Sequence, residues 1–225
     1  MDHEERAAAL LAYSDETASC ERCALAAGRT QVVFGAGDPD AELVFVGEAP
    51  GFHEDQQGVP FVGQAGQLLD RLLEGIGLGR EDVYVVNLLK CRPPGNRDPL
   101  AEEIASCEPH LFRQLELVQP RVVATLGNFA TKLLSGKPHG ITRVHGQEQE
   151  VTLGASRVLL YPLFHPAAAL YTPSMLSVLE QDFARLTELL GQPRDEHARL
   201  REPPSAQPRE EQPEPELQTV QLGLF

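Results

Sequence analysis

Four short apolar runs recur along the chain, each followed by a polar or glycine-rich segment. They cover residues 42–47, 83–89, 121–127 and 157–164. Runs of this length, rich in valine and leucine, are typical of strands that are buried on both faces of a parallel sheet. Between the runs, leucines recur at spacings of three and four residues, as in AGQLLDRLLEGIGL, which predicts amphipathic helices.

This alternation of strands and helices predicts right-handed crossover connections and a sheet covered on both faces. We therefore expect an α/β fold, a three-layer α/β/α sandwich with a central four-stranded parallel sheet. The segment GITRVHGQEQEV is expected to form a hairpin or loop before the last strand, and SMLSVLEQDFARLTELL a closing helix that ends at Gly191.

The domain organisation follows from a change in composition at Gly191. Beyond it the chain is rich in Pro, Glu, Arg and Gln, with few apolar residues before Leu217. Such a segment cannot bury enough surface to become ordered. We expect one main domain over residues 1–190, a disordered linker over 191–216 and a short terminal peptide over 217–225.

The composition is that of an ordinary globular protein, with 42% apolar residues in a chain of 225. No segment approaches the roughly 18 uninterrupted apolar residues of a membrane span, and the acidic start MDHEER is unlike the basic start of a signal peptide. We expect a cytoplasmic, acidic monomer with no membrane partner.

The formal net charge of −14 by itself argues against a nucleic-acid partner, but its distribution weakens that objection. Half of the excess lies at the ends, with −4 over residues 1–27 and −3 over residues 191–225. In the body, residues 83–97, 117–147 and 151–179 contain no acid. Uneven surface composition would explain this pattern, and so would a side of the molecule that faces an anion.

Polar residues follow all four apolar runs, where parallel strands bring their carboxyl ends to one edge. In open parallel sheets, ligands bind beyond that edge. The residues are Glu48, Asn87, Asn128 and His165. Any one of them alone is readily explained as a helix cap or a satisfied polar residue, but a carboxylate, two amides and an imidazole together indicate a ligand site.

The loop GEAPGFHEDQQGVPFVGQAG, residues 47–66, brings Phe61 to the same edge. An asparagine amide offers a donor and an acceptor side by side, which matches the edge of a pyrimidine, and a phenyl face can stack on its ring. The glycines of the loop allow a close approach of the backbone, and its prolines reduce the loop's freedom. A nucleobase is the ligand that this combination favours.

These motifs resemble a known family. GEAPG-x-x-ED, G-x-PFVG-x-AG, N-x-x-KCRPPGNRDP and HP-x-x-x-L follow one another as in the family 4 uracil-DNA glycosylases, the iron-sulfur branch of the uracil-DNA glycosylase superfamily. The likeness spans about residues 20–190, and order and spacing together make it specific. It implies a hydrolase of base excision repair, which cleaves the N-glycosidic bond of deoxyuridine in DNA, releases uracil and leaves an abasic site.

The resemblance implies three roles in base recognition and departure. Phe61 would stack on a uracil flipped out of the DNA, and Asn87 would read its polar edge. His165 would donate a hydrogen bond toward uracil O2 as negative charge develops on the leaving base. Removal of one such donor typically costs about 3 kcal/mol of transition-state stabilisation.

The resemblance also places carboxylates near the sugar. Glu48 and the backbone at Ala49 would line the pocket beside the sugar and the attacking water. Glu54 and Asp55 match the acidic pair of the family. Spacing does not decide whether one of these two or Glu48 positions the water.

Contacts with DNA are expected from two segments. Lys90, Arg92 and Arg97 lie in an acid-free stretch and are expected to bind DNA, single- or double-stranded. Leu170, in HPAAALYTP, matches the position of an apolar wedge that fills the space left by the flipped base, although packing into the core would explain Leu170 equally well.

The four cysteines are better explained as ligands or buried thiols than as disulfides, because cytoplasmic thiols stay reduced. Cys20 and Cys23 form a C-x-x-C motif, and fifteen residues separate Cys91 from Cys107. Spacing alone leaves zinc, an iron-sulfur cluster and inert thiols open. The resemblance favours a [4Fe-4S] cluster on all four, with a structural role.

The chain ends in QLGLF, in which Gln221, Leu222, Leu224 and Phe225 resemble the peptide that binds the bacterial sliding clamp. On a disordered linker, such a peptide would hold the enzyme beside replicating DNA. Two alternatives to uracil release stay open from the sequence. One is a glycosylase for other deaminated bases such as hypoxanthine, and the other is a non-catalytic iron-sulfur adaptor docked on the clamp.

Overall fold

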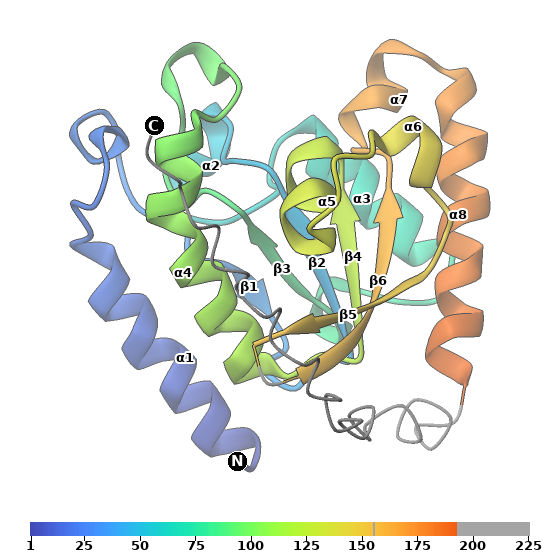
Figure 1. Cartoon of the computed structure of the whole chain (residues 1–225), viewed down its shortest axis with the longest axis horizontal. Helices are drawn as coiled ribbons and strands as arrows, with labels where there is room; N and C mark the ends of the chain where they lie inside the picture. The colour runs from blue at the N-terminus through green and yellow to red at the C-terminus, as the bar shows by residue number, and fades with distance from the viewer. Residues whose placement is uncertain (155, 193–225) are drawn as a thin grey trace, which may run out of the picture. The chain divides into compact units, whose positions relative to one another are not determined.

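A mixed sheet lies at the centre of the part of the chain that the structure describes, residues 1–154 and 156–192 (Figure 1). In this computed structural model the strand order is β1-β3-β2-β4-β6-β5. The strands are β1 (Ala36–Gly37), β2 (Leu43–Gly47), β3 (Tyr84–Asn87), β4 (Val122–Leu126), β5 (Gln149–Leu153) and β6 (Ser156–Leu163). The inner four are parallel, whereas β1 and β5 pair antiparallel at the two edges.

The predicted α/β fold and its four parallel strands are confirmed, and the described sheet has two strands more than expected. The segment expected to form a hairpin or loop before the last strand instead contains the short helix α6 (Ile141–Val144) and most of β5, which pairs antiparallel with the last strand, β6. β5 alternates between partly buried and exposed residues, as an edge strand does, whereas β2, β3 and β4 are buried throughout. β1 has two residues, too few to produce a pattern in the sequence.

Helices cover both faces of the sheet and give the three expected layers (Figure 1). One face packs against α1 (His3–Ala18), α4 (Ala101–Val118) and α5 (Asn128–Ser135). The other packs against α3 (Gln64–Glu74) and α8 (Ser174–Gly191). Neighbouring strand residues divide between the faces, since Phe45 belongs to the α3 and α8 side whereas Val44 and Val46 belong to the other.

Short helices surround the carboxyl ends of the parallel strands, at the upper edge in Figure 1. α2 (Phe52–Gln57) follows β2, and α7 (Ala167–Tyr171) follows β6. The remaining short elements are α6 (Ile141–Val144) and the 3-10 helices η1 (Ala24–Ala27), η2 (Arg80–Asp82) and η3 (Pro94–Asn96). The segments that carry the candidate site residues therefore gather at one edge of the sheet.

Candidate functional site

The ends of β2 and β3 lie side by side and set the geometry of the site. The parallel register pairs Gly47 with Asn87. A Cβ atom at Gly47 would lie 2.3 Å from Asn87 Oδ1 and 2.7 Å from the Phe61 ring. Because no side chain fits at such distances, glycine is required here. The Asn87 amide and the Phe61 ring thus meet over Gly47, as the sequence predicts.

Phe61 also meets His165, so that three of the predicted site residues come together. The two rings are stacked, with centroids 5.6 Å apart and an angle of 24° between their planes. Phe61 has a left-handed backbone, with φ of +56°. Arg80 Nη2 donates to its carbonyl oxygen at 2.8 Å, and Gly66 packs against the same carbonyl. These contacts hold the backbone of Phe61 in place and so set the direction in which its ring points.

The Asn87 side chain has an unfilled capacity for a hydrogen bond. Asn87 is 2% exposed, and its Oδ1 has no hydrogen-bond partner among the described residues. Buried polar atoms nearly always have a partner, so an exception beside an aromatic ring indicates a ligand. The missing partner is a donor, such as a ring N–H of a pyrimidine.

His165 is held as a neutral hydrogen-bond donor. The backbone N–H of Ala167 donates to His165 Nδ1 at 3.1 Å, which leaves the ring proton on Nε2. Desolvation lowers the pKa of His165 to about 4, and the opposing effect of Glu54 does not offset it. At neutral pH the imidazole therefore presents an N–H group and carries no charge.

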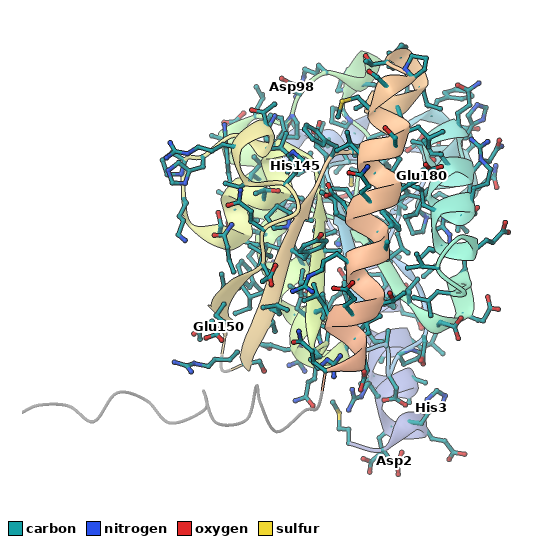
Figure 2. All side chains as sticks on the ribbon, turned by 90° about the vertical axis from the view of Figure 1, so that its right-hand side faces the viewer. Asp2, His3, Asp98, His145, Glu150 and Glu180 are labelled. Carbon is teal, nitrogen blue, oxygen red and sulfur yellow. The ribbon has the colours of Figure 1, made fainter. Side chains whose placement is uncertain are left out.

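The three carboxylates of this region have different environments. Glu48 is half-buried. Desolvation raises its pKa, and the negative charge of Asp98 adds a smaller effect in the same direction. Figure 2 labels Asp98 at the end of the domain opposite to His3. Glu54 Oε1 accepts hydrogen bonds from the backbone N–H groups of Val62 and Gly63, at 3.0 and 2.8 Å. Glu54 therefore secures the loop that carries Phe61, while Glu48 has no hydrogen-bond partner for its carboxylate among the described residues.

Other predicted residues have structural contacts. Asp55 is buried and accepts from the backbone N–H of Thr30 at 2.9 Å, so it ties α2 to the N-terminal segment. Asn128 Oδ1 accepts from the backbone N–H of Ile141 at 2.8 Å and holds the start of α6. Ala49, the residue after Glu48, packs against the apolar cluster that contains Cys91 and Cys107.

All four cysteines are free and line one cavity. Cys91 and Cys107 are buried, whereas Cys20 and Cys23 are partly exposed. As free thiols, Cys91 and Cys107 have a raised pKa because both are desolvated. The cavity joins the segment after α1, the segment after β3 and helix α4.

Side-chain nitrogen groups lie beside two of the four sulfur atoms. His110 Nε2 lies 3.3 Å from Cys20 Sγ, and Arg29 Nη1 donates to Cys91 Sγ at 3.7 Å. The hydroxyl of Tyr13 lies 2.7 Å from His110 Nδ1, which leaves Nε2 free to donate to the sulfur. Such contacts orient and stabilise metal thiolates.

The spacing of the sulfur atoms can be compared with that of zinc ligands. Within the described residues, no three of the cysteine sulfurs lie within 4.8 Å of one another. Zinc at about 2.3 Å from each sulfur would hold tetrahedral ligands about 3.8 Å apart. The sulfur atoms as they lie in this structure therefore do not form a ready-made zinc site.

Comparison with known proteins agrees with this geometry. The family model of the uracil DNA glycosylase superfamily matches residues 34–190. The chain belongs to this superfamily. It is 47% identical to the type-4 uracil-DNA glycosylase of Archaeoglobus fulgidus, over 78% of this chain and 90% of the relative. It is 46% identical to that of Saccharolobus solfataricus, over 79% and 85%, and 43% identical to that of Sulfurisphaera tokodaii, over 80% and 84%.

Of the DNA-binding residues predicted for this superfamily member, Lys90 is wrong, and the Arg97 side chain is already bound to another residue of the protein. Lys90 is 1% exposed, and its Nζ donates to the Asn87 carbonyl oxygen at 2.7 Å, so it cannot reach a phosphate. Burial lowers the pKa of Lys90 to about 7, against the opposing effect of the nearby thiols. Arg97 binds both oxygens of Glu103, at 2.6 and 2.9 Å, which occupies its guanidinium.

The remaining predicted DNA contacts lie at the surface. Arg92 is partly exposed, lies 5.2 Å from the centre of the exposed Phe52 ring and donates to Asn96 Oδ1. Leu170 is 38% exposed on α7, and the adjacent Tyr171 is 87% exposed. The interpretation of Leu170 as a core residue is therefore wrong, and the wedge interpretation stays a prediction.

Three residues of the site were not foreseen from the sequence. Arg80 and Arg29 act on groups distant in the chain, and nothing in their neighbourhood indicates this. His110 had a signal, because it follows Cys107 by three residues on a helix and so shares its face.

The clamp-like residues Gln221, Leu222, Leu224 and Phe225, like the linker, lie outside the described residues, and clamp binding stays a prediction. None of the described helices is long and apolar enough to cross a membrane.

Proposed function

We propose that this protein is a uracil-DNA glycosylase that hydrolyses the N-glycosidic bond of deoxyuridine. The observation that carries the proposal is the unpaired, buried Asn87 Oδ1 beside the Phe61 ring. Uracil offers N3–H to that oxygen and O4 to the amide N–H group, and its ring stacks on the phenyl face. The type-4 names of the relatives support the same activity.

The chemistry follows from the positions of charge. The C1′–N1 bond breaks with its electron pair moving to uracil, and the sugar becomes cationic. The neutral imidazole of His165 donates through Nε2 to O2 of the departing anion. The Glu48 carboxylate stabilises the sugar cation and accepts a proton from the water that adds to C1′. The base must first leave the DNA stack, at a cost of a few kcal/mol.

We also propose that Cys20, Cys23, Cys91 and Cys107 hold a [4Fe-4S] cluster. The donors at three of these sulfurs and the wide spacing support it. The cluster would supply a rigid covalent link between chain segments and no chemistry at the sugar. Arg92 and Leu170 would contact uracil-containing DNA, and the terminal QLGLF would bind a sliding clamp.

The test uses labelled oligonucleotides, single-stranded or duplex, that contain one uracil, hypoxanthine or thymine, with abasic sites detected by alkaline cleavage. We expect cleavage at uracil, and a rate roughly 100-fold lower for Asn87→Ala because the base loses its reader. Asn128→Ala, which removes the other strand-end amide, is the matched control and should retain the rate. Absence of uracil release by the wild-type chain would contradict the proposal.

A further inference from the structure

Lys90 touches both the cysteine cavity and the residue that reads the base. Its Nζ donates to the Asn87 carbonyl oxygen at 2.7 Å, and its backbone N–H donates to Cys107 Sγ at 3.3 Å. The next residue in the chain is Cys91. The side chain is almost fully buried, so the whole connection runs through the interior.

When it is protonated, Lys90 needs a negative partner inside the protein. Among the described residues, no carboxylate forms an ion pair with it. A buried ammonium without a counter-charge is strongly unfavourable. The nearest sulfur groups are Cys107, whose Sγ accepts from the Lys90 backbone N–H, and Cys91, the next residue in the chain. Both carry negative charge once a metal group holds them as thiolates.

We propose that Lys90 is a positioning residue that couples the cysteine-bound cluster to uracil binding through its hydrogen bond to the Asn87 carbonyl. The inference rests on the proposed function. Thiolates of the loaded cluster hold the ammonium in place, and the ammonium fixes the end of β3. The Asn87 side chain has no protein partner at Oδ1, so the backbone must fix its direction. Loss of the cluster would then weaken uracil binding at a site it does not touch.

The experiment replaces Lys90 by methionine, which keeps the length of the side chain and removes its charge and its donors. The full chain is purified anaerobically with its iron. Three quantities are measured: iron per chain, the reduction potential of the cluster, and the inhibition constant of free uracil. In Lys90→Met we expect retained iron, a lower reduction potential because a nearby positive charge is gone, and inhibition by uracil about tenfold weaker.

The matched control is Gln114→Met. Gln114 is also fully buried and also donates to a backbone carbonyl, that of Phe34 at 2.8 Å, but its hydrogen bonds among the described residues reach neither Asn87 nor a cysteine. The Gln114→Met variant should lose thermal stability and keep the wild-type reduction potential and uracil inhibition constant. Lys90→Arg, which restores a cation and hydrogen-bond donors, should bring the reduction potential and the inhibition constant most of the way back to the wild-type values. A merely structural role for Lys90 would make Lys90→Met behave like the control.

A measurement on the wild-type chain covers the case in which Lys90→Met does not fold. If the two sites are coupled, saturating uracil must strengthen retention of the iron against a chelator, because linkage is reciprocal. Iron retention that is the same with and without uracil would overturn the inference, as would a folded Lys90→Met with normal uracil inhibition. Failure of the proposed function is distinguishable from failure of the coupling. In the first case the wild-type chain would release no uracil or contain no iron, and there would then be no coupling to test.

Discussion

At the scale of single residues, burial acts on Glu48 and His165 in opposite directions. Desolvation disfavours the charged form of each group, so it raises the pKa of the carboxyl and lowers that of the imidazole. As the pH falls, Glu48 takes up its proton first, at a pH above its usual range. His165 stays neutral until about pH 4.

We therefore expect the acid limb of kcat/KM to follow Glu48 and not His165. Activity should fall as the pH drops through the raised pKa of Glu48, because the neutral carboxyl no longer stabilises a cation. Glu48→Gln should lower the rate at neutral pH by about 100-fold and remove the limb. Single-turnover uracil release, followed between about pH 4 and pH 9, measures both effects.

Asp98→Asn supplies the control for this profile. The charge of Asp98 contributes to the raised pKa of Glu48, so its removal should move the limb to lower pH without abolishing it. An acid limb that persists unchanged in Glu48→Gln would show that another group titrates.

The residue types at the site are predictable because parallel strands bring their ends to one edge, where Glu48, Asn87 and His165 were expected. Their partners are not predictable in the same way. Lys90 is buried because its ammonium donates to the Asn87 carbonyl oxygen and its side chain lines the cysteine cavity. Neither contact leaves a signal in the sequence around Lys90. The sequence leaves open whether Glu54 positions the water, and in the structure its hydrogen bonds are with the loop backbone.

At the scale of elements, α7 connects the site to the surface. It begins two residues after His165 and ends with two exposed apolar side chains, Leu170 and Tyr171. An exposed apolar pair at the rim of a base-binding site is placed to enter a DNA stack.

We expect Leu170→Ala to slow uracil release about tenfold on duplex DNA and less than about twofold on single strands, because only the duplex has a stack to refill. Leu11→Ala changes an exposed leucine on α1 and should leave both rates as they are. Single-turnover rates on the two substrates give the ratio. Equal losses on duplex and single strands would contradict a wedge.

Elements with strong patterns were predictable, and those set by tertiary contact were not. β2, β3, β4 and β6 are buried apolar runs, and α3 has the leucine spacing of an amphipathic helix. β1 is a strand only because Ala36 and Gly37 pair with β3. The tight turn at Phe61 depends on Arg80 and Gly66, so its left-handed backbone leaves no trace in the local sequence.

At the scale of the whole molecule, the cysteine cavity joins parts of the chain that are far apart in sequence. It links the segment after α1 to β3 and α4. Binding energy for a group held there contributes to folding, because the unfolded chain has no such site.

We expect anaerobically purified protein to absorb near about 400 nm and to contain iron, as cysteine-bound clusters do. Cys107→Ala should lose the iron and lower Tm by at least about 5 °C. Ser106→Ala, which changes the neighbouring residue of the same cavity, should keep both. Iron analysis and thermal unfolding measure these effects, and iron-free wild-type protein would contradict the cluster.

The antiparallel strands at the borders of the sheet have a consequence for behaviour at high concentration. β1 presents two residues of backbone, and β5 carries the exposed Glu150, labelled in Figure 2. A short border and a charged one are poor templates for strand addition. Within the part of the chain that the structure describes, the sheet therefore offers copies of the protein little edge to pair through, even at high concentration.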